Sequence, residues 1–172
     1  MHDTRLPKVV YFLMLLMGVL QWMRAYRQLP DRMASHFDFY GRANGRQPKE
    51  AFFLVLAVVI VMTGVMGFLI PVVIAAAPTE FINLPRKDYW LAPERREETL
   101  RFLRTHLEWF ACGVLLVLLY AASQAINANL PDHAPFGARG LLYALAGFLL
   151  LTLAGTVRLM RHFYRAPRQD SF

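Results

Sequence analysis

The sequence contains a single cysteine, Cys112, so no disulfide bond can form within the chain. Cys112 lies in an apolar stretch, where a thiol side chain is more typical of packing than of reactivity. The sequence also has no phosphate-binding loop, haem-attachment motif, dinucleotide fingerprint or nucleophile elbow. Ser35 adjoins His36, but neighbours in sequence rarely face each other productively. These absences argue against a nucleotide-dependent or hydrolytic enzyme.

Charged residues are absent from four long apolar stretches, at residues 9–23, 51–79, 109–131 and 140–157. Hydrophobic residue types make up 56% of the 172 residues, which is unusually many for a soluble domain. About 20 helical residues cross the roughly 30 Å apolar core of a bilayer. The second and third stretches are long enough to span this core. The first and fourth are shorter and need flanking Lys or Arg residues that reach the headgroups.

We therefore predict an all-α fold, a four-helix transmembrane bundle forming a single domain of residues 1–172. The predicted spans are about 7–26, 52–77, 107–128 and 139–158, with an outer loop at 27–50 and a cytoplasmic loop at 78–106. A cleaved signal peptide is the alternative for the first stretch, because Arg5 and Lys8 resemble a basic leader. The bulky residues at 21–24 do not suit a cleavage site, so we favour a retained helix.

The net charge of +7 is distributed for a membrane and not for a nucleic acid, since the cations flank the apolar stretches. With four spans, the amino terminus, the loop 78–106 and the tail share one side, which carries 12 of the 19 Lys and Arg residues. We predict both termini in the cytoplasm, membrane lipids as partners, and a protein partner or a second copy as a further candidate partner.

The loop 27–50 carries the most patterned segment of the chain, from Leu29-Pro30 to Lys49. Its aromatic residues suit a loop folded on the membrane surface. Gly41 and Gly45 allow positive-φ turns, so we expect a hairpin or compact turn near residues 42–44.

The loop 78–106 carries a second motif, Asn83-Leu-Pro followed by Asp-Tyr89-Trp90. Tyr89 and Trp90 suit an interface anchor. Pro93 suits the first turn of a helix, and the acidic residues after it suit the positive end of the helix dipole. We predict an interfacial amphipathic helix that begins at Pro93 and turns into the third span. Glu108 lies where that span enters the membrane, and it could serve a gating or proton role; we favour instead that it snorkels to the interface or pairs with an arginine of residues 101–104.

These motifs resemble a bacterial family of membrane proteins of unknown function, whose domain also forms the amino-terminal part of the Sdp-type toxin immunity protein. The matching residues are Leu29, Pro30, Arg32, His36, Phe37, Gly41 and Lys49. Asp38 departs from the asparagine that relatives often carry, and Arg46 stands where many place a tryptophan. The resemblance implies location in a bacterial inner membrane and a role in sensing or sequestering something. It implies no known reaction.

Two kinds of site follow from the loop residues. We predict that a ligand is held by Arg32, His36, Asp38, Tyr40, Gly41, Lys49, Asn83, Tyr89 and Trp90. The arginines of the first loop, with Tyr40 and Asn44, could instead hold an anion such as a lipid headgroup or a peptide carboxylate, but we favour ordinary interface anchoring for them. The alternative is a divalent metal site of His36, Asp38, Asp132 and His133, because imidazole and carboxylate suit zinc and similar ions.

We predict a non-enzymatic membrane protein whose outer loop recognises a ligand, lipid or peptide, in a sensing, immunity or accessory-subunit role. The alternative is a small membrane enzyme or transporter built on the polar or metal centre near the outer interface.

Overall fold

A computed structural model of the protein describes residues 5–131 and 136–165, and these are mostly helical. The elements in chain order are α1 (Leu6–Tyr26), β1 (Arg32–Phe37), β2 (Ala43–Pro48), α2 (Lys49–Gly64), η1 (Val65–Leu69), α3 (Ile70–Ala76), η2 (Thr79–Phe81), α4 (Lys87–Trp90), α5 (Arg96–Asn127) and α6 (Ala138–Tyr164). Because α2, η1 and α3 follow one another directly, they form one long helix, Lys49–Ala76.

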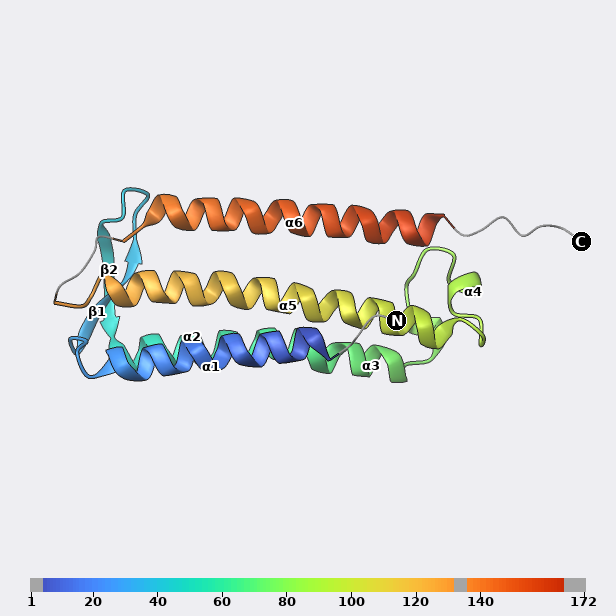
Figure 1. The fold of residues 1–172 in the computed structure, drawn as a ribbon, viewed down its shortest axis with the longest axis horizontal. Helices are drawn as coiled ribbons and strands as arrows, with labels where there is room; N and C mark the ends of the chain where they lie inside the picture. The colour runs from blue at the N-terminus through green and yellow to red at the C-terminus, as the bar shows by residue number, and fades with distance from the viewer. Residues whose placement is uncertain (1–4, 132–135, 166–172) are drawn as a thin grey trace, which may run out of the picture.

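Four helices of the described residues are long and apolar enough to cross a membrane: α1, Lys49–Ala76, α5 and α6. This agrees with the four uncharged stretches of the sequence. The helices run side by side along the long axis of the molecule (Figure 1). The β-hairpin lies at one end, which we call the hairpin end. The end of α3, α4 and the end of α6 lie at the other, which we call the α4 end, and α1 begins short of it (Figure 1).

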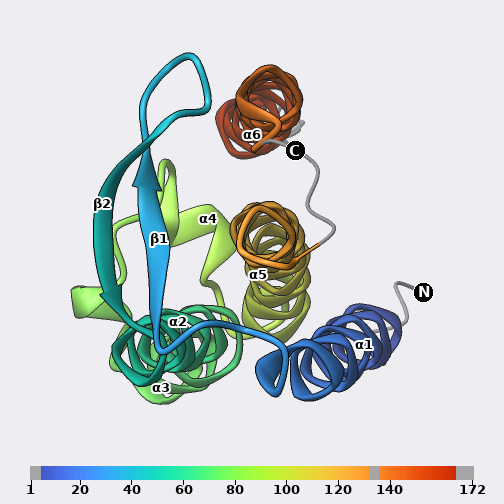
Figure 2. The same ribbon diagram turned by 90° about the vertical axis from the view of Figure 1, so that its left-hand side faces the viewer.

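Helix α5 occupies the centre of the bundle, between α6 on one side and α1 and α2 on the other (Figure 2). Its Leu115 and Ile126 are almost fully buried, and they belong to the main apolar core together with residues of α1 and α2. The hydroxyl of Tyr11 on α1 shares a 2.8 Å hydrogen bond with the Thr63 hydroxyl on α2. Most other large apolar side chains point outward, as expected for helices that contact lipid.

The long helix Lys49–Ala76 is interrupted by the π-helical turn η1, which ends two residues before Pro71. Proline has no N–H, and its ring crowds the carbonyl four residues earlier, which belongs to Gly67. A wider π turn relieves that conflict. A Cβ on Gly67 would lie 2.5 Å from Cβ of Ala111, so this glycine also lets η1 approach α5 closely.

The prediction of an all-α fold is wrong for the loop 27–50, where β1 and β2 form a two-stranded antiparallel sheet. An isolated hairpin is marginal in water, but this one is anchored by Leu29 and Met33, which are 4% and 0% exposed and pack into the main core. The pairing is irregular near His36, where the register shifts on both sides. A small sheet therefore covers the hairpin end.

The predicted interfacial helix from Pro93 is not a separate element, because α5 begins at Arg96 and continues without a break to Asn127. No proline lies within these 32 residues, so nothing stops the helix where the apolar stretch begins. A helix of this length is about 48 Å long, which exceeds the roughly 30 Å bilayer core. Its first turns pack instead against the α4 segment, where Leu91 and Leu100 form a second small core with Ile82.

Glu108 is fully buried on α5 and pairs with two cations. Its Oε1 accepts a 2.9 Å hydrogen bond from Nε of Arg104, which confirms the predicted pairing, and lies 3.6 Å from Nζ of Lys8 on α1. Its Oε2 has no hydrogen-bond partner among the described residues. These contacts tie the start of α1 to α5.

Candidate functional site

A cavity of about 900 Å³ opens between α2, α5 and α6 directly beneath the hairpin. Most of its lining is apolar and comes from three helices: Phe52 and Leu56 of α2, Leu118 of α5, and Leu141 and Leu145 of α6. It forms because α6 packs along α5, while the hairpin bridges from α2 toward α6 (Figure 2). We call this cavity the hairpin groove.

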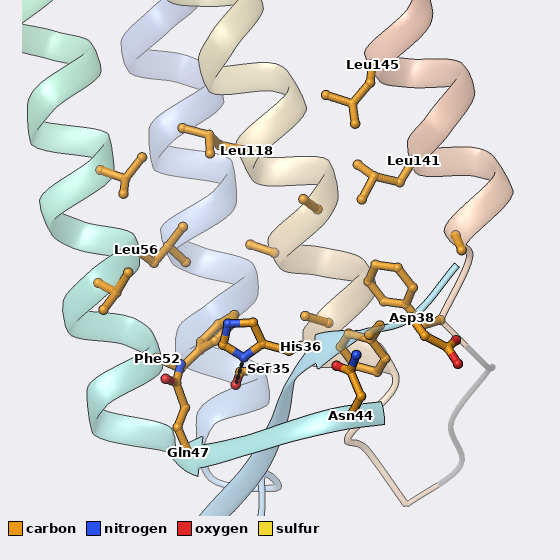
Figure 3. A pocket seen from close by; sticks show the side chains of 18 of the residues that line it. Ser35, His36, Asp38, Asn44, Gln47, Phe52, Leu56, Leu118, Leu141 and Leu145 are labelled. Atoms are coloured by element: carbon orange, nitrogen blue, oxygen red, sulfur yellow. Dashed lines mark hydrogen bonds between the residues drawn. The ribbon is translucent and has the colours of Figure 1, made fainter. Parts of the chain in front are cut away.

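The polar part of the hairpin groove is confined to the end formed by the hairpin (Figure 3). Nδ1 of His36 lies 3.1 Å from the Ser35 hydroxyl. The side-chain amides of Asn44 and Gln47 also line the groove and form no hydrogen bond with another described residue. An apolar channel thus ends at polar groups, most of which can donate and accept hydrogen bonds, with the carboxylate of Asp38 beside them.

Asn129, just beyond α5, holds the hairpin in place. Its Oδ1 accepts a 2.7 Å hydrogen bond from the Ala34 N–H, and its Nδ2 donates to the Ala34 carbonyl at 2.9 Å and to the Ala125 carbonyl at 2.7 Å. Ala34 is only 4% exposed, so one amide side chain satisfies both buried backbone groups of this strand residue.

The hairpin turn contacts the segment before α6, which completes the far wall of the groove. The rings of Phe37 and Phe136 stack with centroids 4.2 Å apart. Gly41 has φ = +79°, and a Cβ there would lie 2.5 Å from the Phe136 carbonyl oxygen, so both backbone and space require glycine. Oδ1 of Asp38 accepts the N–H groups of Tyr40 and Arg42 at 2.9 and 2.8 Å, which fixes the turn.

The hairpin residues that were predicted to bind a ligand fall into two groups. His36 and Asp38 line the hairpin groove. Arg32 and Tyr40 lie exposed outside its lining, and Tyr40 is 80% exposed at the hairpin turn. Lys49 binds the strand ends together, since its Nζ donates to Asp31 at 3.1 Å and to the Leu29 carbonyl at 3.4 Å.

The predicted ligand residues of the second loop lie at the α4 end, away from the hairpin (Figure 1). Trp90 donates from Nε1 to the Phe163 carbonyl at 2.9 Å, so it attaches α4 to the end of α6. The Tyr89 ring lies under the guanidinium of Arg95 at 4.0 Å. Asn83 lines a separate, mostly apolar cavity of about 360 Å³. The structure therefore does not gather all nine predicted residues into one site.

The predicted metal site is only half within the described residues. Oδ1 of Asp38 is occupied by two backbone N–H groups, and Nδ1 of His36 by the Ser35 hydroxyl. Asp132 and His133 lie outside the described residues. Within 5–131 and 136–165, no group of three His, Cys, Asp or Glu side chains is placed to hold a metal.

Gln47 and the apolar residues of α2, α5 and α6 are groove residues that the sequence did not single out, whereas Asn44 was proposed to help hold an anion. Leu118 and Leu141 look like any other lipid-facing leucine in a sequence. Asn129 was visible as part of a polar stripe at the end of the third apolar stretch. Amides at the end of an apolar helix are a usable signal, because they must find partners when buried.

The helices and the groove define a class: a small helical protein with four membrane-span-like helices, whose hairpin closes a lateral groove. Within that class, a family model described as a domain of unknown function (DUF1648) matches residues 9–62. This domain covers most of α1, the whole hairpin and most of α2. The finding fits an uncharacterised family, and nothing in it ties the chain to the toxin immunity protein. No curated protein and no solved structure matches the chain.

Proposed function

We propose that this protein is a non-enzymatic membrane protein that binds one amphiphilic molecule in the hairpin groove. The observation that carries the proposal is the distribution of polarity in this cavity. Apolar side chains line it along three helices, and polar side chains line only the hairpin end. An acyl chain would replace lipid between the helices, and a neutral polar headgroup would meet His36, Asn44 and Gln47.

The size of the groove suits such a ligand. A cavity of about 900 Å³ lies within the range of roughly 300–1,000 Å³ that is typical of small-molecule sites. Its polar lining contains one carboxylate, Asp38, whose Oδ1 is already held by the turn. A headgroup with hydroxyl or amide groups therefore fits better than a strongly charged one, because buried charge without a partner is costly. A sensing or immunity role requires only that the protein binds such a molecule.

Most Lys and Arg residues lie toward the α4 end, so we propose that this end faces the cytoplasm and the hairpin faces outward. The groove would then open within the outer half of the membrane. An amphiphile could enter sideways from the lipid, without crossing water.

A photoactivatable monoacylglycerol tests the proposal on the purified full chain in nanodiscs. Leu141→Trp places a large ring in the groove and should lower cross-linking at least tenfold. Leu153→Trp is the matched control, because Leu153 lies on the same helix, is 60% exposed and does not line the groove. Gln47→Ala should weaken binding about two- to tenfold, since one hydrogen bond contributes about 0.5–1.5 kcal/mol.

Specific binding also requires that unlabelled monoacylglycerol competes and that labelled peptides come from α2, α5 and α6. Equal labelling of the two tryptophan variants, with no competition, would mean that the groove holds only bulk lipid and would refute the proposal.

A further inference from the structure

A second cavity, of about 590 Å³, lies at the α4 end between α4, the start of α5 and the end of α6. In contrast to the hairpin groove, its lining is rich in cations: Arg95, Arg101 and Arg158, with His162 and the single carboxylate of Glu98. We call it the arginine cavity. It lies at the opposite end of the bundle from the hairpin, and nothing in the hairpin groove accounts for it.

Two of its arginines have guanidinium nitrogens available for a ligand. Arg158 forms no ion pair or hydrogen bond with another described residue. Arg95 donates from Nε to the Tyr89 carbonyl at 2.9 Å and stacks on the Tyr89 ring, which holds it in place and leaves its terminal nitrogens without an acceptor among the described residues. Arg101 is paired with Glu97, four residues earlier.

One wall of the arginine cavity is a rigid aromatic stack. The His162 ring lies 4.7 Å from the Trp90 ring on one side and 4.7 Å from the Phe102 ring on the other. The hydrogen bond from Trp90 to the Phe163 carbonyl fixes this stack against α6. A cavity wall that is already ordered loses little entropy when a ligand binds, so this wall favours a defined site over diffuse attraction to headgroups.

A smaller, mostly apolar cavity of about 280 Å³, which His106 also lines, adjoins the arginine cavity along the seam between α5 and α6. Arg158 and Phe102 line both cavities, while Trp109 and Leu159 line the smaller one only. The molecule thus offers, side by side, a cationic cavity and an apolar slot that runs toward the middle of the bundle. A free anion would use only the first of these.

We infer that the α4 end binds the phosphate group of an anionic lipid. The phosphate lies in the arginine cavity with Arg95 and Arg158, and the start of an acyl chain lies in the slot beside Trp109. Guanidinium groups suit phosphate because they offer paired donors in one plane together with a permanent positive charge. A soluble phosphate ester also has a phosphate group for the arginine cavity, but it has no acyl chain to occupy the slot.

The purified full chain, in a zwitterionic detergent, is titrated with dioctanoyl phosphatidic acid, dioctanoyl phosphatidylcholine and glycerol 3-phosphate. Binding is read by isothermal calorimetry. Phosphatidic acid should bind at least tenfold more tightly than either of the other two. Arg158→Gln should weaken that binding tenfold or more. Arg161→Gln is the matched control, because Arg161 lies three residues later on the same helix and lines neither cavity, so its affinity should stay within twofold.

A second variant separates the two halves of the site. Trp109→Ala should weaken phosphatidic acid severalfold and leave glycerol 3-phosphate unchanged. Equal affinity for glycerol 3-phosphate and phosphatidic acid would overturn the lipid assignment in favour of a free phosphate ester. Equal losses in Arg158→Gln and Arg161→Gln would overturn the site itself, because general surface charge would then explain the binding.

Discussion

The two ends of the bundle are closed by chain segments of similar length that use charge in opposite ways. At the hairpin end, Lys49 is 15% exposed and its charge is taken up by Asp31 and a backbone carbonyl. The cavity beneath it is lined mainly by apolar and amide groups. At the α4 end, Arg95 and Arg158 line a cavity with no carboxylate paired to them among the described residues. Similar covers thus enclose cavities of different charge at the two ends.

The covers are also attached differently. Asn129 alone makes the three side-chain hydrogen bonds that join the hairpin to the last turns of α5. At the α4 end the attachment is shared between Trp90, which bonds to Phe163, Thr99, which bonds to Trp90, and Arg96, which bonds to the carbonyls of Ala75 and Ala77. We therefore expect that a single substitution can detach the hairpin from the bundle, but not the α4 segment.

Asn129→Ala tests this most strongly. The change removes three hydrogen bonds and leaves the buried N–H and carbonyl of Ala34 unpaired, so we expect a loss of about 2–4 kcal/mol in the free energy of unfolding. The free energy is measured by denaturant unfolding in detergent, followed by tryptophan fluorescence. Trypsin should also cut faster after Arg42 and Arg46 when the hairpin is released.

Asn127→Ala is the matched control, because Asn127 lies two residues earlier, is exposed and makes no side-chain hydrogen bond with a described residue. Its unfolding free energy and its cleavage rate should match those of the unchanged protein. If both variants lose stability equally, the attachment does not depend on Asn129.

Glu108→Gln tests the other half of the molecule. It should lower the free energy of unfolding less than Asn129→Ala does. The buried carboxylate supports Arg104 and Lys8, and charge-assisted hydrogen bonds contribute about 1.5–3 kcal/mol. Both cations are about one-third exposed and can turn toward water, so we expect a loss of about 1–3 kcal/mol. Denaturant unfolding measures it. Glu97→Gln, which removes an exposed pair on the same helix, should lose under about 0.5 kcal/mol, and an equal loss in both would contradict the role given to burial.

The helices could be predicted from the sequence because a bilayer core sets a minimum length for an uncharged stretch. The β-hairpin could be predicted only in part. Gly41 indicated the turn. Met33 anchors the hairpin in the main core through contacts with helices that are distant in the sequence. Local sequence carries no record of such contacts, so a hairpin or compact turn was expected near residues 42–44 without its attachment to the core.

The candidate site was partly predictable for the same reason. His36 was singled out by its motif, and it does line the hairpin groove. Asp38 was expected to act with it, yet its Oδ1 is held by the turn, a role that asparagine at this position could also fill. Leu118 and Leu141 come from helices far apart in the chain, and no pattern in the sequence distinguishes them from leucines that contact lipid.

Asp31→Asn should produce the smallest effect and sharpens the distinction between the two ends. The Asp31 side chain is 96% exposed, so its 3.1 Å contact with Lys49 is weakened by water and salt. Lys49 keeps the Leu29 carbonyl and lies 5.1 Å from the centre of the Tyr26 ring. We expect a loss below about 1 kcal/mol, measured by denaturant unfolding at low salt, and a smaller one at high salt. Monoacylglycerol cross-linking should stay unchanged, because neither Asp31 nor Lys49 lines the groove. A large loss of cross-linking with unchanged stability would instead mean that Lys49 contacts the ligand, and the hairpin end would then use its cations as the α4 end does.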